Sequence, residues 1–211
     1  MTIEERIIEL AKTYRENLAE KIEARKIEMT EDNLDHYFLY NVLGITNEEG
    51  YEIDLFQNVG RFLYKYAGSF LEDAAKICFE EKFGIENAHR EYVPNNIDNS
   101  PKRFEIDCLV EKTLGIELKW RDATTDGDHK NKEKKRVTSV SAAGYTPVRL
   151  MFYKPNRSQS IKIQKGIKEI YEELGGQYYA GTDAFDYVRE TTGINLLSII
   201  ENISASSTKL L

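Results

Sequence analysis

Apolar residues in the N-terminal part of the chain recur at helical spacing. Over residues 3–29 they fall every three or four positions, which predicts one long amphipathic helix. A second helix is expected over residues 30–40 with Thr30 as its N-cap, and a third over residues 62–83, where Gly84 provides the stop. The polar, glycine-containing stretch between these two helices is interpreted as a break.

The period changes to two after the turn-rich segment 94–101. Two strands are expected, over residues 104–110 and 116–121, and the short turn 111–115 joins them into a hairpin. Strict alternation puts the charged residues of the first strand on one face, together with Leu109. Its opposite, apolar face is expected to consist of Phe104, Ile106, Cys108 and Val110.

Helices and strands alternate in the rest of the chain. In chain order we expect a basic helix, a strand, a helix, a strand and two short helices at residues 129–143, 148–153, 159–174, 177–180, 184–190 and 195–201. No internal repeat divides the chain, and 211 residues are enough for one sizeable core. The pattern predicts a single α/β domain over residues 1–211, with a helical arm over 1–59 and the core over 60–211.

The composition is that of an ordinary globular protein, with 41% hydrophobic and 31% charged residues, and excludes an intrinsically disordered chain. No apolar run reaches the length of a membrane span, and the acidic, amphipathic N-terminus is unlike a signal peptide. Cys78 and Cys108 lack metal-ligand spacing, so we expect buried free thiols and no zinc site. A soluble, cytoplasmic protein without membrane contact is predicted.

The net charge of −7 is unevenly distributed along the chain. Residues 1–100 carry 11 Lys/Arg and 21 Asp/Glu, whereas residues 101–170 carry 16 Lys/Arg and 9 Asp/Glu. At cellular salt, a phosphate backbone responds to charges within roughly 10 Å and not to the whole protein. The basic segment can therefore form a DNA-binding face on an acidic protein, and a solvated basic face without a ligand is the alternative.

The pattern most informative about chemistry is Asp107, separated by nine residues from Glu117-Leu118-Lys119. Alternation places Glu117 and Lys119 on one face of their strand, and a turn centred near Lys112 puts Asp107 across from Glu117. Two carboxylates this close repel each other by on the order of a few kcal/mol, so something must compensate this repulsion. Mg²⁺ prefers carboxylate oxygens and retains the water that phosphodiester hydrolysis needs. An exposed strand face with ordinary charges is the alternative interpretation.

The residues after the second strand carry a competing motif. From Asp122 to Glu133 the sequence approaches a calcium EF-hand loop, with Asp at positions 1 and 5, Gly at 6 and Glu at 12. Thr124 stands at position 3, and the sequence has no second loop. In the simpler interpretation, this stretch is a loop in which Asp126 or Asp128 caps the basic helix, and His129 and Lys130 lie near phosphate.

Residues 104–107 (FEID) and 115–120 (GIELKW) resemble the core of the PD-(D/E)XK nucleases, a family common among type II restriction endonucleases. The resemblance covers about residues 60–155, and the wider text, including residues 145–154, is similar to the ApaLI-like enzymes. One departure is Ile106, which replaces the family's proline. The resemblance implies a restriction-endonuclease-like core, in which a mixed β-sheet is flanked by helices.

The resemblance also implies a role for each matching residue. Asp107 and Glu117 would be ligands of Mg²⁺, and Lys119 would be the catalytic lysine. The family places a glutamate on the helix before the hairpin, and Glu72 matches that position as an accessory metal ligand. A solvated helix residue is the alternative for Glu72.

Candidate DNA contacts follow from the positions of basic and amide side chains. Phosphate contacts are expected from the basic helix, through Lys130, Lys132, Lys134, Lys135 and Arg136. Residues in two polar loops are candidates to contact bases, because Arg pairs with guanine and Asn with adenine. These residues are Asn95, Asn96, Lys102, Arg103, Lys154, Asn156 and Arg157.

The leading hypothesis is a type II restriction endonuclease that hydrolyses double-stranded DNA with Mg²⁺ at a specific, palindromic site. A palindrome matches a two-fold symmetric homodimer, and the arm over residues 1–59 is large enough to build its interface. The alternative with the same core is a structure-selective repair or junction-resolving nuclease. A non-catalytic calcium- or DNA-binding module is the hypothesis from another functional class.

Overall fold

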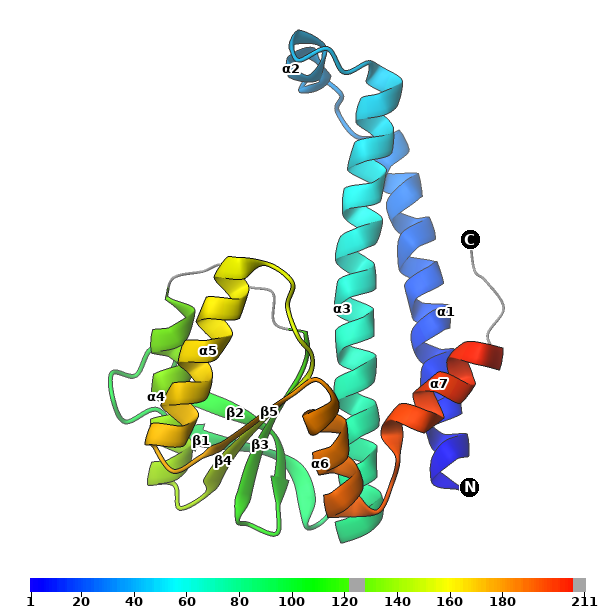
Figure 1. Cartoon of the computed structure of the whole chain (residues 1–211). Helices are drawn as coiled ribbons and strands as arrows, with labels where there is room; N and C mark the ends of the chain where they lie inside the picture. Colours follow the sequence, from blue (N-terminus) through cyan, green and yellow to red (C-terminus); the bar gives the residue numbers. More distant parts are fainter. Residues whose placement is uncertain (122–127, 207–211) are drawn as a thin grey trace. The chain divides into compact units, whose positions relative to one another are not determined.

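The computed structural model describes residues 1–121 and 128–206 (Figure 1). By its internal contacts the chain divides into two compact units. One consists of Ile8–Phe70, and the other combines Met1–Ile7 with Leu71–Leu211. The boundary between a helical arm and a catalytic core, as drawn from the sequence, stays a prediction.

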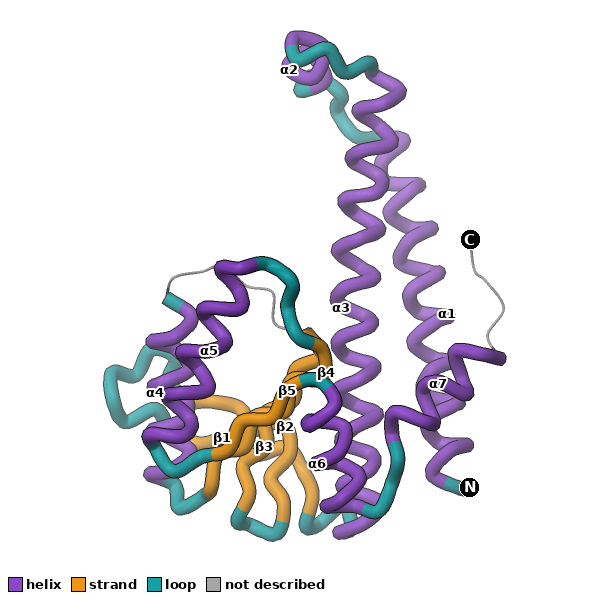
Figure 2. Tube along the Cα trace, viewed as in Figure 1, coloured by secondary structure: helices purple, strands orange, loops and turns teal. Residues whose placement is uncertain are grey.

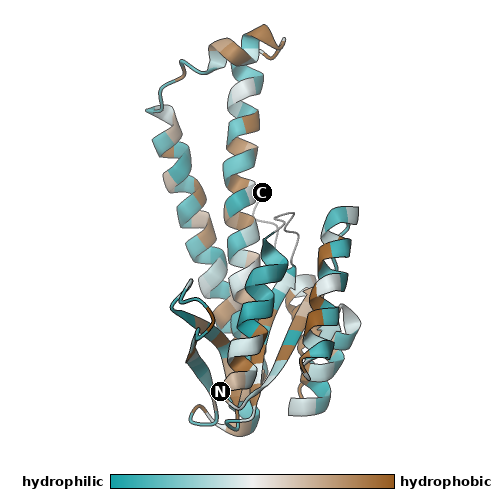
Figure 3. Cartoon of the chain, turned by 90° about the vertical axis from the view of Figure 1, so that its left-hand side faces the viewer, coloured by the Kyte–Doolittle hydropathy of each residue, from teal (hydrophilic) through white to brown (hydrophobic). Residues whose placement is uncertain are grey.

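The first unit contains most of α1 (Ile3–Thr30), all of α2 (Tyr37–Val42) and the first part of α3 (Asn47–Phe83). Hydrophilic and apolar residues alternate along the two long helices in Figure 3, as the amphipathic pattern predicts. Tyr14 of α1 meets Tyr66 of α3 edge to face, with ring centroids 6.1 Å apart. The prediction of the first helix is confirmed.

The predicted starts of the second and third helices are wrong. Thr30 ends α1, and its hydroxyl donates to the carbonyl oxygen of Ile27 at 2.7 Å instead of capping a new helix. The third helix begins earlier than expected because Thr46 and Glu49 form a capping box. The Thr46 N–H donates to Glu49 Oε2 at 2.8 Å, and the Glu49 N–H donates to Thr46 Oγ1 at 3.2 Å. The helix therefore continues through Gly50.

The second unit is built on a mixed five-stranded sheet in the order β1-β2-β3-β4-β5 (Figure 2). Antiparallel pairing joins the first three strands, and parallel pairing joins the last three. The strands are β1 (Ala88–Pro94), β2 (Arg103–Val110), β3 (Leu114–Arg121), β4 (Thr146–Tyr153) and β5 (Gln177–Ala180). This sheet and its flanking helices confirm the predicted fold class, an α/β restriction-endonuclease-like core.

The sequence interpretation missed β1. This strand lies at the edge of the sheet, and only Ala88 and Val93 are fully buried in it. An edge strand that exposes polar side chains on both sides leaves no clear apolar alternation. Its pairing with β2 nevertheless helps to position the hairpin that follows.

Helices lie on both faces of the sheet. Helices α4 (His129–Ala142), α5 (Ser158–Glu173) and α6 (Thr182–Thr192) contact its strands, and α7 (Leu196–Ser206) contacts α6. Within β4, Arg149 pairs with Glu133 of α4, whereas Phe152 meets Phe185 of α6 with ring centroids 4.8 Å apart. Alternate strand residues point to opposite faces, so α4 and α5 cover one face and α6 lies on the other. Helix and strand predictions in this region are confirmed within a few residues.

Cys78 and Cys108 are buried and free, which confirms the prediction for both thiols. Burial raises the pKa of each thiol to about 12, so both stay protonated. Among residues 1–121 and 128–206, no helix combines the length and the apolar character that a membrane span requires.

Candidate active site

The hairpin of β2 and β3 brings three predicted residues together. Lys119 Nζ lies 2.7 Å from Glu117 Oε1 and 3.5 Å from Asp107 Oδ2. The strands pair next to the turn in a register centred on Lys112, as expected. The paired residues are Cys108 with Ile116, Leu109 with Gly115 and Val110 with Leu114. One register step further would place Asp107 opposite Glu117, but the ladder of paired residues ends at Cys108 and Ile116.

A bulge in β2 accounts for the position of Asp107. Between the pairs His89–Leu109 and Glu91–Ile106, β1 contributes one residue and β2 contributes two, of which Asp107 is the first. The extra residue shifts the alternation, so that Leu109 joins Ile106 in the apolar cluster that packs against α4. The strict alternation predicted for this strand is therefore wrong beyond Ile106. Bulges commonly re-aim a side chain beside an active site.

The Asp107 carboxylate is anchored to the neighbouring strand. Its Oδ2 accepts a hydrogen bond from the Leu118 N–H at 2.8 Å. The same oxygen faces the Lys119 ammonium, which also donates to the Leu118 carbonyl oxygen at 2.9 Å. These contacts fix the Asp107 side chain of β2 against the backbone of β3 and beside the Lys119 ammonium group.

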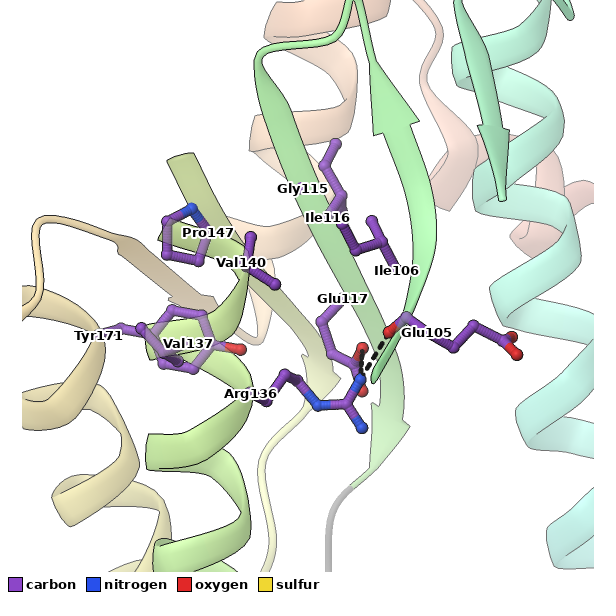
Figure 4. Close-up of a pocket in the computed structure, with 10 residues that line it drawn as sticks. All are labelled: Glu105, Ile106, Gly115, Ile116, Glu117, Arg136, Val137, Val140, Pro147 and Tyr171. Atoms are coloured by element: carbon purple, nitrogen blue, oxygen red, sulfur yellow. Dashed lines mark hydrogen bonds and ion pairs between the residues drawn. The ribbon is translucent and has the colours of Figure 1, made fainter. Parts of the chain in front are cut away.

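Glu117 is buried and held from two sides. Lys119 takes one carboxylate oxygen, and Arg136 Nη1 of α4 donates to the other at 2.8 Å (Figure 4). The same Nη1 donates to the Glu105 carbonyl oxygen of β2 at 2.7 Å. Burial alone would raise the pKa of Glu117, but Lys119, Arg136 and Arg149 lower it below its ordinary value. Glu117 is therefore ionised.

The other two acids of the site hold their protons more tightly. Burial, followed by the charge of Glu117, raises the pKa of Asp107 to about 6. Burial raises the pKa of Glu72 to about 7; Lys119 opposes this shift, and Asp107 and Glu117 add to it. Burial would lower the pKa of Lys119, but Glu117, Asp107 and Glu72 raise it well above its usual range. Three acids thus share one ammonium group that stays charged.

The donor chemistry of this cluster fits a divalent cation. Asp107 and Glu117 supply carboxylate oxygens, which Mg²⁺ prefers. Burial raises the pKa values of Asp107 and Glu72, and the charges of the neighbouring acids add to this effect. No group of three acidic, histidine or cysteine residues gathers closely enough to hold a metal within residues 1–121 and 128–206. In this structure the two carboxylate oxygens of Glu117 contact Lys119 and Arg136.

Behind Glu117 lies a buried network of charged residues. Arg149 of β4 is fully buried, and its Nη1 donates to Glu133 Oε2 at 2.9 Å. The Tyr171 hydroxyl of α5 reaches the same oxygen at 3.4 Å, and Arg136 Nε lies 3.4 Å from Glu133 Oε1. A cavity of about 10 Å³, the size of one water, is lined by Glu117, Arg136 and Tyr171 among others (Figure 4). The network ties Arg136, and through it Glu117, to the sheet and to both helices on this face.

This network was missed in the sequence interpretation, although one signal was present. Arg149 interrupts an otherwise apolar strand, and a charge in such a place needs a buried partner. Arg136 was assigned there to a phosphate-contacting cluster. The structure gives it a different place, with its guanidinium group on Glu117 and the β2 backbone.

The other candidate DNA-contacting residues differ in whether their side chains are exposed or already engaged in contacts within the protein. Lys130, Lys132 and Lys134 are exposed on α4, as are Asn156 and Arg157 at the start of α5. Lys135 forms an ion pair of 2.5 Å with Asp98, and the guanidinium group of Arg103 stacks on the Tyr92 ring at 4.1 Å. Asn95 is fully buried and stabilises its own loop, because its Nδ2 donates to Asp98 Oδ1 and to the Pro101 carbonyl oxygen. It is therefore placed as a structural residue.

One residue of the competing calcium motif is engaged elsewhere in the structure. Its first part, including Asp122 and Asp126, lies outside the described residues. Its last position, Glu133, is buried in the ion pair with Arg149. Asp128 stands at the N-cap of α4 without a side-chain cap hydrogen bond, and His129 is the first residue of that helix.

Comparison with known protein families identifies the family of the chain. The family model described as ApaLI-like restriction endonuclease matches residues 1–205. The chain belongs to this family. ApaLI-like membership confirms the resemblance found in the sequence and makes the chain a restriction endonuclease, a nuclease that acts on DNA. Neither the curated proteins nor the solved structures compared with the chain give a significant match.

The raised pKa values of the site predict how stability depends on pH. Glu72 and Asp107 are expected to stabilise the metal-free fold fully below about pH 4, and this contribution is lost as pH rises through about 6 to 7. Urea denaturation in EDTA at several pH values measures the effect. Glu72→Gln should make the free energy of unfolding less dependent on pH near pH 7. Glu169→Gln, on the exposed side of α5, should leave the pH dependence unchanged. An identical profile for Glu72→Gln and wild type would contradict the electrostatic description of the site.

Proposed function

We propose that the protein is a type II restriction endonuclease that cuts double-stranded DNA at a specific, palindromic site with Mg²⁺. The supporting observation is the contact of Lys119 with both Glu117 and Asp107 on one hairpin, in a chain of the ApaLI-like family. Two acids and a lysine in contact supply a metal-ligand set and a fixed positive charge. Phosphodiester hydrolysis needs both.

Each residue of the site has a distinct task in this proposal. Asp107 and Glu117 hold Mg²⁺, with Glu72 as an accessory ligand. When bound, the metal supplies a Lewis acid for the phosphate and a water of lowered pKa. Lys119 keeps its proton and stabilises the charge that develops on the phosphate oxygens. Arg136 is a positioning residue in this proposal, because its guanidinium group holds Glu117 and the Glu105 carbonyl oxygen.

The exposed basic residues supply the DNA contacts. Lys130, Lys132 and Lys134 bind phosphates, together with Arg103, Lys135, Asn156 and Arg157 at the neighbouring edges of the unit. Phosphate contacts of this kind fix the position of the duplex and carry no sequence information by themselves. The loops beside them are left to contact the bases.

The proposal is tested by incubating the protein with plasmid DNA and Mg²⁺ and sequencing the fragment ends. One repeated sequence at the ends of linear duplex fragments is the expected result. Cutting of branched DNA alone, with linear duplex left intact, would instead establish the structure-selective nuclease. Binding of DNA or Ca²⁺ without any cutting would establish the non-catalytic module.

A homodimer is part of the proposal, since a two-fold symmetric enzyme matches a palindrome. Its support is a set of apolar residues in and beside α2 that are between 62% and 77% exposed: Phe38, Leu39, Val42 and Leu43. Isolated exposed apolar residues are normal, but a contiguous group of this kind marks an interaction surface. We assign a second copy of the chain to this surface.

The double variant Leu39→Asp, Leu43→Asp is expected to sediment as a monomer, whereas the wild type sediments as a dimer. Each aspartate would have to be desolvated in the interface, which costs far more than the dimer gains there. Plasmid should then be nicked in one strand instead of cut in both. Ile85→Asp, at an apolar position equally exposed in the other unit, is the control and should remain dimeric. A double variant that stays dimeric would place the interface elsewhere.

A further inference from the structure

A pocket of about 380 Å³ lies between the sheet and α5, in a part of the unit that the proposed chemistry does not use. This volume is within the range of small-molecule sites in proteins. The strands β4 and β5, the helix α5 and the start of α6 contribute its walls. The residues that matter for its chemistry are Met151, Lys154, Gln164, Lys165, Lys168 and Tyr178.

The pocket is next to the candidate active site on the same face of the sheet. Met151, which lines the pocket, pairs with Lys119 in the parallel ladder of β3 and β4. Paired residues of neighbouring strands point to the same face, and the strands are about 4.8 Å apart. Lys154 follows the carboxyl end of β4, at the edge of the sheet where β3 ends after Lys119. DNA bound at Lys119 therefore passes close to the pocket.

A buried amide provides the polar group of the pocket. Gln164 is 5% exposed, and its Oε1 accepts a hydrogen bond from the Tyr178 hydroxyl at 2.9 Å. Its Nε2 is buried without a hydrogen-bond partner among the described residues. A buried donor left unpaired is costly, and most such groups in proteins are satisfied by some acceptor. The pocket thus offers a donor that fits a carbonyl oxygen or a ring nitrogen of a ligand.

The walls and the rim fit the two halves of a nucleotide. Met151 and the Tyr178 ring form an apolar wall, with the Tyr178 hydroxyl 3.8 Å from the Met151 sulfur. A flat heterocycle packs well against such a wall. Three lysines line the pocket on its exposed side against one acid, Asp183, so the rim is positively charged and attracts phosphate. The three are Lys154, Lys165 and Lys168.

We propose that this pocket holds one nucleotide of the bound DNA, turned out of the helix beside the scissile phosphate. The base enters the pocket and accepts a hydrogen bond from Gln164 Nε2, and the flanking phosphates contact Lys165 and Lys168. Turning a base out costs on the order of a few kcal/mol of stacking and pairing, which these contacts offset. The inference rests on the proposed endonuclease function. A free mononucleotide shares the same chemistry, so the test distinguishes the two sources.

The test uses the duplex whose cleavage site the plasmid experiment maps, with 2-aminopurine placed at each position in turn. This base fluoresces more strongly when it is unstacked. With wild-type protein and Ca²⁺ we expect a clear rise in 2-aminopurine fluorescence at one position of the duplex or at its symmetry-related position. Ala180→Phe, which fills the pocket, should abolish the rise, and Gln164→Met should weaken it.

Two surface variants keep the test independent of folding. Lys165→Gln with Lys168→Gln removes rim charges at exposed positions and should reduce the rise about tenfold at limiting protein, as expected for the loss of two phosphate contacts. Lys162→Gln, exposed on the same helix but outside the pocket, should leave the rise unchanged. Circular dichroism confirms that each variant is folded.

The outcomes separate this inference from the proposed function. If wild type cuts the duplex and no position gives a rise, the inference is overturned and the endonuclease function stands. A rise that persists in folded Ala180→Phe places the base elsewhere and also overturns it. Calorimetry with the four deoxynucleoside monophosphates tests whether the pocket binds a free mononucleotide. If these bind and no base of the duplex becomes unstacked, the ligand of the pocket is a free nucleotide and the inference about DNA is overturned. Absence of cutting by wild type overturns both proposals.

Discussion

Lys119→Ala is expected to fold normally, to bind its cognate duplex in Ca²⁺ with near wild-type affinity, and to cleave at least about 10²-fold more slowly in Mg²⁺. The ammonium group lies 2.7 Å from Glu117 and 3.5 Å from Asp107, and these acids raise its pKa so that it stays charged. That charge matters most as negative charge develops on the phosphate. A loss confined to the transition state lowers turnover and leaves ground-state binding intact.

Single-turnover cleavage and equilibrium binding of the mapped duplex separate these two effects. Lys82→Ala, an exposed lysine in the last turn of α3, is the control and should cut at the wild-type rate. Lys119→Ala protein that cuts as fast as wild type would remove Lys119 from the chemistry. Loss of binding together with cutting would make it a DNA contact.

Glu133→Gln is expected to lower the free energy of unfolding by about 3–5 kcal/mol. The substitution keeps the size of the side chain but leaves Arg149, which is fully buried, without the carboxylate that accepts from its Nη1. Loss of one charge of a buried ion pair accounts for the size of the effect. Arg136 would lose a partner as well, because its Nε lies 3.4 Å from Glu133 Oε1.

Urea denaturation followed by circular dichroism measures this loss. Replacing both partners, as Glu133→Leu with Arg149→Leu, should cost less than Glu133→Gln alone, because both buried charges of the pair are then removed. Glu169→Gln on the exposed side of α5 should stay within about 0.5 kcal/mol of wild type. A Glu133→Gln protein as stable as wild type would show that the network does not support the fold.

The hairpin and its three charged residues could be predicted because each depends on local pattern. Period-two alternation located both strands, and a short turn centred on Lys112 fixed the register near it. The bulge at Asp107 could not be predicted, since an extra residue in one strand is defined only by its partner strand, and β1 itself has almost no apolar alternation. The approach of Asp107 to Lys119 therefore follows from pairing on both sides of β2.

Long-range contacts account for the other differences. Arg136 was grouped with its basic neighbours because sequence proximity gives no sign that it turns inward to Glu117. The buried partners Glu133 and Arg149 are sixteen residues apart and meet only when α4 packs on β4. By contrast, the capping-box residues Thr46 and Glu49 are recognisable in the sequence. They were overlooked because the stretch that contains Gly50 was interpreted as a break between helices.

Cleavage by Asp107→Asn tests the central claim most directly, because asparagine keeps the size of the side chain and an oxygen that can accept from the Leu118 N–H. The account predicts that this variant binds the mapped duplex without metal at least as tightly as wild type and does not cut it at any Mg²⁺ concentration, while Asp186→Asn, exposed on α6, cuts normally. Cutting by Asp107→Asn at the wild-type rate would contradict the assignment of the active site.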